Sequence, residues 1–291
     1  MFISNDDIVK LEGSDRMFYA IYDRISVRTY EKKPLKSDER IVIDQLINEV
    51  KPTKGPFLHT ANFFIDHQDK NLDDEAKRIG TYGFIKNAPS FIIGTIPNVR
   101  EAIIDYGYIF EHLILKLTQS GYGTCWLAGT FDRKAFDSLI KNDLIIPAIT
   151  PVGFAEDSMS LRERAIRVAI KANRRKSFEE MFFVNDTNHP MKNDKNHPLY
   201  YPLEAVQLAP SASNKQPWKI IIEPNRIHLY LEPTPNYATN RPFNIQYLDM
   251  GIALCHFEVA LNHHNIKHTI KTMEHPYKKD FEYIISIELN T

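Results

Sequence analysis

The chain has 291 residues, of which 36 are Lys or Arg and 37 are Asp or Glu, so its formal net charge is −1. Hydrophobic residues make up 43% and charged residues 25%, which is typical of a folded globular protein. This composition excludes a disordered chain, a collagen-like fibre and a small disulfide scaffold. The length suggests two domain-sized units or one larger fused unit.

The composition also limits where the protein works and what it binds. A net charge near zero argues against a nucleic-acid partner, because nucleic-acid binding normally needs a basic face. Apolar runs such as Phe91–Thr95 are too short to cross a bilayer, and Met1–Leu11 lacks an export signal. The only two cysteines, Cys125 and Cys255, suit a reducing compartment. We therefore expect a cytoplasmic protein without a membrane or nucleic-acid partner.

Hydrophobic periodicity and turn residues predict alternating helices and strands along the chain. The first part is predicted to form helices at 17–23, 37–50, 73–81, 99–120 and 132–141, with strands at 62–65, 89–94 and 149–154. Leu161–Ala172 is strongly basic, and Asn185–His197 has the polar composition of a linker. Beyond it we expect a helix at 203–208, a long helix around Asp249, and strands at 219–222 and 283–288.

A short pattern occurs twice, at the same point of two long predicted helices. Asp105-Tyr-Gly is followed by His112, and Asp249-Met-Gly is followed by His256, so both copies read D-x-G-x4-H. Each long helix precedes an apolar strand. The pattern indicates either two copies of one αβ unit, the second shortened, or a coincidence between two amphipathic helices. The repeat alone does not separate these alternatives.

The first candidate for ligand binding is the segment Arg24-Ile-Ser26-Val-Arg28. In an extended segment, alternate side chains point to one side, so two guanidiniums and a hydroxyl would form a fork suited to phosphate or a polar ring edge. The plainer alternative is a solvated segment whose arginines pair with Asp23 or Glu31.

Three further segments have compositions suited to a ligand. Ala209-Pro-Ser-Ala-Ser-Asn-Lys-Gln-Pro-Trp218 cannot continue a helix, and its small side chains would let a planar ligand lie flat against it. Gly121-Tyr-Gly-Thr-Cys-Trp-Leu-Ala-Gly129 permits close approach of backbone amides to a ligand. Asn173-Arg-Arg-Lys176 is a basic cluster that would bind phosphate or form a solvated face.

Patterns for metal binding, triphosphate binding and catalytic dyads are missing from the sequence. It contains no Walker loop, G-x-S-x-G, H-E-x-x-H or G-x-G-x-x-G motif. His263, His264 and His268 lack carboxylate or cysteine company, which favours surface histidines over a metal site. Cys125 has neither a nearby histidine nor a C-x-x-C partner, which favours a buried apolar role. We therefore expect no metal site and no catalytic side-chain dyad.

Taken in this order, the four segments resemble the nitroreductase superfamily of FMN-dependent NAD(P)H oxidoreductases. The resemblance runs from about Tyr22 to Ile266, and its motifs are specific as a set, although each is weak alone. It implies an α/β (α+β) fold of two similar units, each with a mixed, mostly antiparallel sheet and packed helices, joined through long central helices.

The chain departs from the usual order of these motifs. In the ordinary family each unit carries all four, and two units form a dimer that binds FMN at its interface. Here the first half has R-x-S-x-R but only Val50-Lys-Pro-Thr-Lys-Gly-Pro-Phe57 in place of the A-P-S turn, which appears only in the second half. The chain is thus similar to single-chain, duplicated nitroreductases. We expect a fused pseudo-dimer with a first half at 1–172, a connecting arm at 173–198 and a second, shortened half at 199–291.

The resemblance also implies roles for individual residues. The arginines and hydroxyl of the first motif would bind the FMN phosphate, ribityl chain and ring edge, and the basic cluster would complete the phosphate clamp. The segment after Trp126 would present its backbone near flavin N5 and O4, and the A-P-S turn would cover the ring. The expected cofactor-binding residues are Arg24, Ser26, Arg28, Leu127, Ala128, Gly129, Arg174, Arg175, Pro210, Ser211, Ala212 and Asn214.

The activity implied is ping-pong reduction of electron-poor small molecules, such as nitroaromatics or quinones, with NADH or NADPH as electron donor. The flavin would carry the chemistry, so no catalytic side chain is expected. One chain would complete the site as a monomer, and further oligomerisation stays open. The alternatives are a flavin-binding or carrier protein without turnover, the same fold performing flavin fragmentation or reductive dehalogenation, and a duplicated scaffold that has lost flavin.

Overall fold

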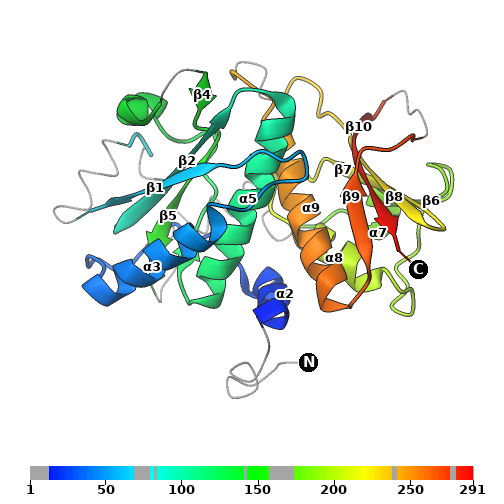
Figure 1. Cartoon of the computed structure of the whole chain (residues 1–291), viewed down its shortest axis with the longest axis horizontal. Helices are drawn as coiled ribbons and strands as arrows, with labels where there is room; N and C mark the ends of the chain where they lie inside the picture. The colour runs from blue at the N-terminus through cyan, green and yellow to red at the C-terminus, as the bar shows by residue number, and fades with distance from the viewer. Residues whose placement is uncertain are drawn as a thin grey trace.

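The computed structural model describes residues 13–68, 79–81, 84–140, 143–156, 174–237, 241–275 and 280–290. Most of the helix predicted at 73–81 and the whole basic stretch 161–172 lie outside these residues. Two β-sheets lie on either side of a central pair of long helices (Figure 1). We refer to residues 13–156, which carry the first sheet, as the first half, and to residues 174–290, which carry the second sheet, as the second half.

The first sheet is antiparallel throughout its named strands. Its strand order is β1-β2-β5-β3, with β4 pairing with β2. The strands are β1 (Asn62–His67), β2 (Ser90–Pro97), β3 (Gly123–Thr124), β4 (Leu144–Ile145) and β5 (Ile149–Gly153). Ile92 and Ile96 of β2 belong to the core around the central helices, whereas Phe91 and Ile93 belong to a separate core on the other face. This alternation follows from the two-residue period of a strand.

The second sheet has the order β6-β7-β8-β10-β9, and only the β6–β7 pair is parallel. Its strands are β6 (Phe182–Val184), β7 (Trp218–Glu223), β8 (Arg226–Leu231), β9 (His268–Lys271) and β10 (Glu282–Leu289). Part of the predicted arm at 173–198 therefore belongs to this sheet, because β6 lies within it. The predicted mostly antiparallel character of both sheets is confirmed, and the second sheet is mixed through its parallel β6–β7 pair.

The central helices are α5 (Arg100–Gln119) and α9 (Gln246–His263), and both are buried around most of their circumference. They cross where Gly107 faces Gly251. A Cβ atom at Gly107 would overlap the carbonyl oxygen of Leu248, and one at Gly251 would overlap that of Ile104. Leu248 lies three residues before Gly251, and Ile104 lies three residues before Gly107. Each glycine therefore meets the equivalent residue of the other helix, so the crossing is approximately two-fold symmetric. Glycine is required here because only its backbone permits so close an approach.

Shorter helices surround this pair. They are α2 (Gly13–Asp23), which contacts both central helices, α3 (Ser37–Val50) on α5, α8 (Tyr200–Leu208) on α9, and the single turn α7 (Phe178–Met181). The segment predicted as a helix at 132–141 is instead the 3-10 helix η1 (Arg133–Leu139). One continuous hydrophobic core includes residues from both halves, so the two sheets do not enclose separate domain cores. Within the described ranges, no helix is both long and apolar enough to span a membrane.

Candidate functional site

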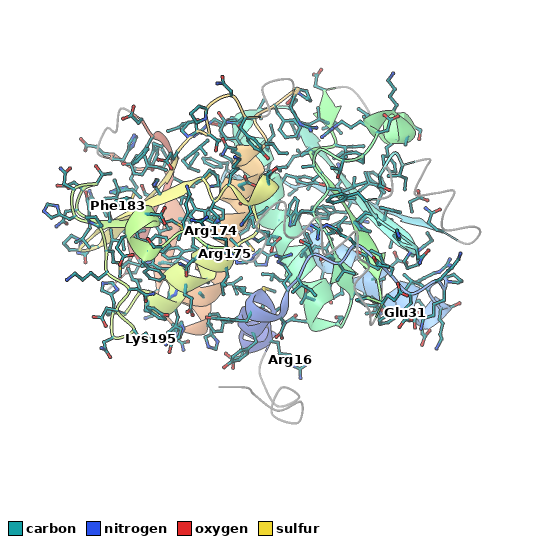
Figure 2. The ribbon with its side chains drawn as sticks, turned by 180° about the vertical axis from the view of Figure 1, so that it is seen from behind. Arg16, Glu31, Arg174, Arg175, Phe183 and Lys195 are labelled. Atoms are coloured by element: carbon teal, nitrogen blue, oxygen red, sulfur yellow. The ribbon has the colours of Figure 1, made fainter. Side chains whose placement is uncertain are left out.

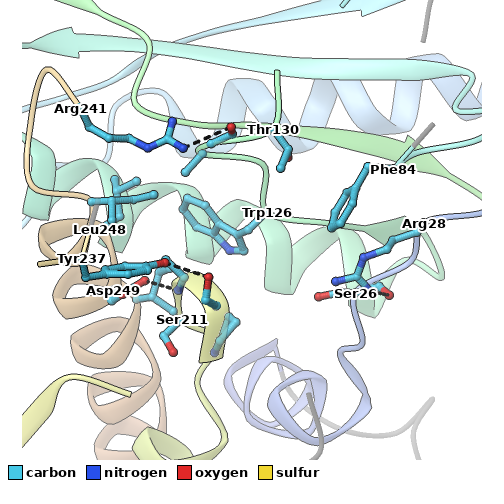
Figure 3. A pocket seen from close by; sticks show the side chains of 17 residues that line it. Ser26, Arg28, Phe84, Trp126, Thr130, Ser211, Tyr237, Arg241, Leu248 and Asp249 are labelled. Carbon is cyan, nitrogen blue, oxygen red and sulfur yellow. Dashed lines mark hydrogen bonds between the residues drawn. The ribbon is translucent and has the colours of Figure 1, made fainter. Parts of the chain in front are cut away.

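A cavity of about 450 Å³ lies between the two halves (Figure 3). First-half residues form one wall and second-half residues the other. Its lining consists of Ser26, Arg28, Phe84, Trp126, Ala128, Gly129, Thr130, Pro210, Ser211, Ala212, Ser213, Tyr237, Arg241, Ile245, Leu248, Asp249 and Ile252. Arg28 and Arg241 occupy opposite ends of it (Figure 3). A cavity of this size, with mixed apolar and cationic walls, can hold a planar ligand carrying negative charge.

The segment after α2 supplies Ser26 and Arg28 to the cavity. Ser26 bridges Thr124, so the segment extends the first sheet and its alternate side chains share a face. Arg28 is only 5% exposed, and its guanidinium lies 5.0 Å from the Phe84 ring centre. Its Nη1 makes a long hydrogen bond of 3.4 Å to the Ser26 carbonyl, and its buried Nε has no hydrogen-bond partner. Arg28 therefore retains buried donor capacity beside the cavity.

Trp126 is held in the cavity wall by a buried glutamate. The indole Nε1 donates to Glu111 Oε2 at 2.6 Å, and Glu111 is fully buried on α5. The other carboxylate oxygen lies 2.9 Å from His256 Nε2 on α9 and 3.7 Å from Arg24 Nε. This network joins the two halves directly behind the cavity and fixes the plane of the indole. Beyond Trp126, Ala128 and Gly129 present no bulky side chain to a ligand.

The second-half wall is a tight turn between α8 and β7. It contains the 3-10 turn η2 (Ala212–Asn214), and Ser213, Asn214 and Gln216 all have positive φ angles, of 50°, 55° and 49°. Such conformations cost free energy in non-glycine residues and cluster at functional sites. Specific bonds hold the turn: Gln216 N donates to Ser211 Oγ at 2.9 Å, and Ala212 N donates to Asp249 Oδ1 at 2.8 Å.

Asp249 and Tyr237 occupy the second-half side of the cavity. Asp249 Oδ2 is buried without a hydrogen-bond partner, and burial raises the pKa of this carboxyl well above its ordinary value. Tyr237 donates to Ser213 Oγ at 3.0 Å, and burial raises its pKa. Arg241 Nη2 reaches back across the cavity to the Gly129 carbonyl at 3.3 Å. The wall thus combines a buried carboxyl group, a phenol and a cation.

A second basic group lies beside the turn, outside the cavity lining. Figure 2 shows Arg174 and Arg175 near the middle of the molecule, seen from behind. Arg175 donates to Asn214 Oδ1 at 3.2 Å and to the Leu208 carbonyl at 3.3 Å. Burial lowers its pKa, and the nearby Arg24 lowers it further. The buried Nη1 of Arg24 has no hydrogen-bond partner. The two guanidiniums place positive charge side by side, and Arg24 keeps a buried donor without a partner, which suits an anion.

All of the predicted site residues except Leu127 fall into two groups in the structure. Those that line the cavity are Ser26, Arg28, Ala128, Gly129, Pro210, Ser211 and Ala212. Arg24, Arg175 and Asn214 lie in the adjacent basic group, and the Arg174 carbonyl accepts a hydrogen bond from Asn214 Nδ2 at 2.8 Å. Leu127 does not line the cavity: its side chain is buried in the first-half core and its backbone bridges Ile149.

Several lining residues were not predicted from the sequence. Trp126 belongs to the segment Gly121–Gly129, and Asp249 belongs to the repeated D-x-G-x4-H pattern. The sequence therefore contained a pattern that could have identified both residues. Phe84, Tyr237 and Arg241 had none, because only the tertiary fold brings them to the cavity.

One solved structure is similar to the whole chain. A crystal structure of a "putative nitroreductase" from Thermotoga maritima MSB8 is similar over 98% of each chain, with 19% identity and a TM-score of 0.57. An FMN-dependent nitroreductase from Clostridium difficile R20291 aligns with 48% of this chain and 88% of its own, at 17% identity and a TM-score of 0.37. No curated protein matches. The family described as "Putative TM nitroreductase" matches residues 16–261, most of the chain. The chain therefore belongs to this nitroreductase family.

Proposed function

We propose that the protein is an FMN-dependent NAD(P)H oxidoreductase that reduces electron-poor small molecules such as nitroaromatics or quinones. The observation that carries the proposal is the cavity between the halves, which has a cationic first-half edge and a flat second-half turn of small residues. Membership of the nitroreductase family supports an oxidoreductase activity. The site supports the cofactor, and the class of acceptor and the electron donor follow from the family resemblance.

The residues present fit FMN. Arg28 has a buried Nε without a hydrogen-bond partner beside the cavity, and Arg24 has an unpartnered Nη1 in the adjacent basic group. A phosphate bound there would supply the acceptor that Arg24 Nη1 lacks, and the neighbouring charge of Arg175 would add to its attraction. The ring would lie between Trp126 and the Pro210–Ser213 turn, whose side chains are small. This arrangement matches the elongated shape of a ligand with one planar end and one anionic end.

The bound flavin would supply hydride chemistry, while the chain positions it and tunes its electronics. Arg28 would place positive charge at the ring edge and so favour the reduced, anionic form. Glu111 holds the Trp126 indole in place by its 2.6 Å hydrogen bond. Donor and acceptor would share the remaining space, each leaving before the other enters, which is the basis of a ping-pong cycle.

We further propose that one chain holds one FMN, as a fused pseudo-dimer of residues 1–172 and 199–291 joined by an arm at 173–198. The first-half counterpart of the A-P-S turn packs directly on α5: a Cβ atom at Gly55 would overlap the Asp105 side chain. This close packing leaves no space for a ligand at the first-half turn, which supports the proposal that only the second-half turn binds flavin. A monomer would then contain a complete site for a small-molecule acceptor, without excluding a dimer.

Two alternatives predict different behaviour. A flavin carrier would bind FMN that NADH and NADPH fail to reduce at a useful rate. A flavin-fragmenting or dehalogenating enzyme needs an acid or tyrosine over the flavin, and Asp249 and Tyr237 are the only described cavity residues of those types. Measuring flavin reduction and then acceptor reduction separates the three activities.

The test of the assigned site is Arg28→Ala, with Arg226→Ala, at an exposed position of β8, as the matched control. Loss of charge-assisted bonds worth about 1.5–3 kcal/mol should raise the dissociation constant for FMN about 10- to 100-fold, whereas the control should leave it unchanged. Fluorescence titration of the ligand-free protein with FMN measures both constants. An unchanged constant for Arg28→Ala would overturn the assignment of this arginine to the flavin.

A further inference from the structure

Arg241 is a cationic residue of the cavity that the proposed FMN site does not use. It lies at the end of the cavity opposite Arg28, whereas the phosphate is assigned to Arg24 and Arg175 (Figure 3). The connection between β8 and α9 supplies Arg241, so this end of the cavity belongs to the second half. A charged side chain that lines a ligand cavity without holding the cofactor is a candidate for recognising the molecule that binds beside the cofactor.

Gly129 of the first half leaves the space that the Arg241 guanidinium occupies. Arg241 Nη2 donates to the Gly129 carbonyl oxygen at 3.3 Å, and a Cβ atom at Gly129 would lie 2.5 Å from that nitrogen. Any larger residue at position 129 would therefore displace the guanidinium. Toward the rest of the described chain, Nε and Nη1 of Arg241 make no hydrogen bond, and neither is a buried atom. These donors are thus accessible to a ligand.

A second guanidinium, that of Arg133, lies beside this end of the cavity, outside its lining. Arg133 Nη2 donates at 2.8 Å to the carbonyl oxygen of Ala128, the residue before Gly129, and its Nε donates to that of Ile146 at 3.1 Å. Burial lowers the pKa of Arg133, and the positive charge of Arg241 lowers it further. Two consecutive carbonyls of the cavity wall are therefore bonded to two cations that repel each other.

These two positive charges have no carboxylate partner among the described residues. Both arginines donate to neutral carbonyl oxygens instead. The carboxyl group in the described lining is that of Asp249, and burial and the hydrogen bond from Ala212 are the influences on its pKa. Taking a guanidinium partly out of water without a counter-ion costs free energy, and an anionic ligand would offset this cost. This end of the cavity is therefore suited to a negatively charged group.

We propose that Arg241 binds a negatively charged group of the electron acceptor, so that the protein favours acceptors carrying a carboxylate over uncharged acceptors of the same shape. The proposal rests on the proposed function and adds a specificity to it. An acceptor whose ring occupies the middle of the cavity directs a charged group to one of its two cationic ends. Arg28 at one end is assigned to the flavin, which leaves Arg241. Its accessible donors would form charge-assisted hydrogen bonds to the carboxylate.

The first test compares two acceptors that differ in charge and little in shape, 4-nitrobenzoate and 4-nitrobenzamide. The ratio of their kcat/KM values is measured in the FMN-loaded protein. Comparing this ratio between variants cancels the intrinsic reactivity of each acceptor and any general loss of activity. In Arg241→Met the ratio of nitrobenzoate to nitrobenzamide should fall about 10- to 100-fold from the wild-type value, the contribution expected of a charge-assisted hydrogen bond.

Two further variants serve as controls for this ratio. Arg241→Lys keeps the positive charge and should retain most of the wild-type ratio. Arg226→Met removes an exposed arginine of β8 and should retain all of it. A ratio that is unchanged in Arg241→Met, or that falls equally in Arg226→Met, would overturn the proposal.

The second test measures binding instead of turnover. Benzoate and benzamide lack the nitro group, and their binding to the oxidised, FMN-loaded protein can be followed by the change in flavin absorbance. Arg241→Met should raise the dissociation constant for benzoate about 10- to 100-fold and that for benzamide much less. Equal changes for the two ligands, or wild-type protein that binds no benzoate, would overturn the proposal.

The phosphates of the electron donor are another source of negative charge, and flavin reduction distinguishes them from the acceptor. A lower ratio of the NADPH rate to the NADH rate in Arg241→Met, with the acceptor ratio unchanged, would assign the arginine to the extra phosphate of NADPH and overturn the proposal. A weaker affinity for FMN with the acceptor ratio unchanged would assign it to the cofactor, with the same consequence. Wild-type protein that binds no flavin would instead contradict the proposed function.

Discussion

In each half of the molecule, an aspartate of the central helix accepts backbone hydrogen bonds from a turn, but the two turns differ. In the first half, Asp105 uses both carboxylate oxygens to hold the segment around Phe57 and His59, and Gly55 packs against that side chain. In the second half, Asp249 uses one oxygen to hold Ala212, and the turn borders the cavity. One anchoring position therefore serves a turn packed against α5 in the first half and a turn that borders the cavity in the second half.

The largest expected effect comes from filling the second-half turn. Ser211→Trp should abolish FMN binding, because an indole would occupy the space that the proposed site gives to the planar ring. Counting back from the residues that donate to each aspartate, Pro56 is the first-half counterpart of Ser211. Pro56→Trp should leave FMN affinity unchanged. Fluorescence titration of both variants with FMN checks the contrast, and equal behaviour of the two variants would remove the functional difference between the turns.

The next largest effect tests the crossing of α5 and α9, to which the two halves contribute one helix each. Gly107→Ala and Gly251→Ala each place a methyl group against the backbone of the opposite helix. Overpacking of this kind should lower the free energy of unfolding by about 1–3 kcal/mol in each variant, outweighing the ~1 kcal/mol gained from the helix propensity of alanine. Urea denaturation measures both. A large loss in one variant and none in the other would contradict the approximately symmetric crossing.

The smallest effect, taken per pH unit, is a pH dependence that should differ between the two aspartates. Because burial raises the pKa of Asp249, the folded protein holds its proton at pH values where the unfolded chain has released it. The free energy of unfolding should therefore fall as pH rises above about 4, by up to about 1.4 kcal/mol per pH unit from this residue. Asp249→Asn should remove this contribution.

For Asp105, burial also raises the pKa, but the hydrogen bonds from Phe57 and His59 oppose it. Asp105→Asn should consequently flatten the pH dependence less than Asp249→Asn does. Urea denaturation of the ligand-free variants from about pH 4 to about pH 7 measures both slopes. A steeper wild-type profile than that of Asp249→Asn supports the account, and identical profiles would show that Asp249 is not protonated in the folded state.

The parts of the cavity that could be predicted are those encoded by local backbone preferences. The turn at 210–213 was recognisable because its small and turn-forming residues cannot continue the preceding helix. Ser26 and Arg28 were recognisable because alternate residues of an extended segment share a face. Arg24 does not continue that alternation: its backbone N–H still bonds to Ala20 of α2, and its side chain approaches Glu111 instead.

Leu127 illustrates a signal that was present in the sequence but not used. Trp126 and Ala128 line the cavity while Leu127 points into the core, as the two-residue period of extended backbone requires. Arg241 and Tyr237 could not be predicted in this way. They come from the connection between β8 and α9, and their approach to the cavity depends on how that connection folds across the two halves.

The most direct test of the central claim is the number of FMN molecules bound per chain. The protein should be purified, reconstituted with FMN and freed of excess, and the flavin released from it should be quantified against protein concentration. Complementary halves that share one cavity predict one FMN per chain, bleached by NADH or NADPH. Two FMN molecules per chain would contradict the assignment of different roles to the two turns, and none would contradict the flavin site itself.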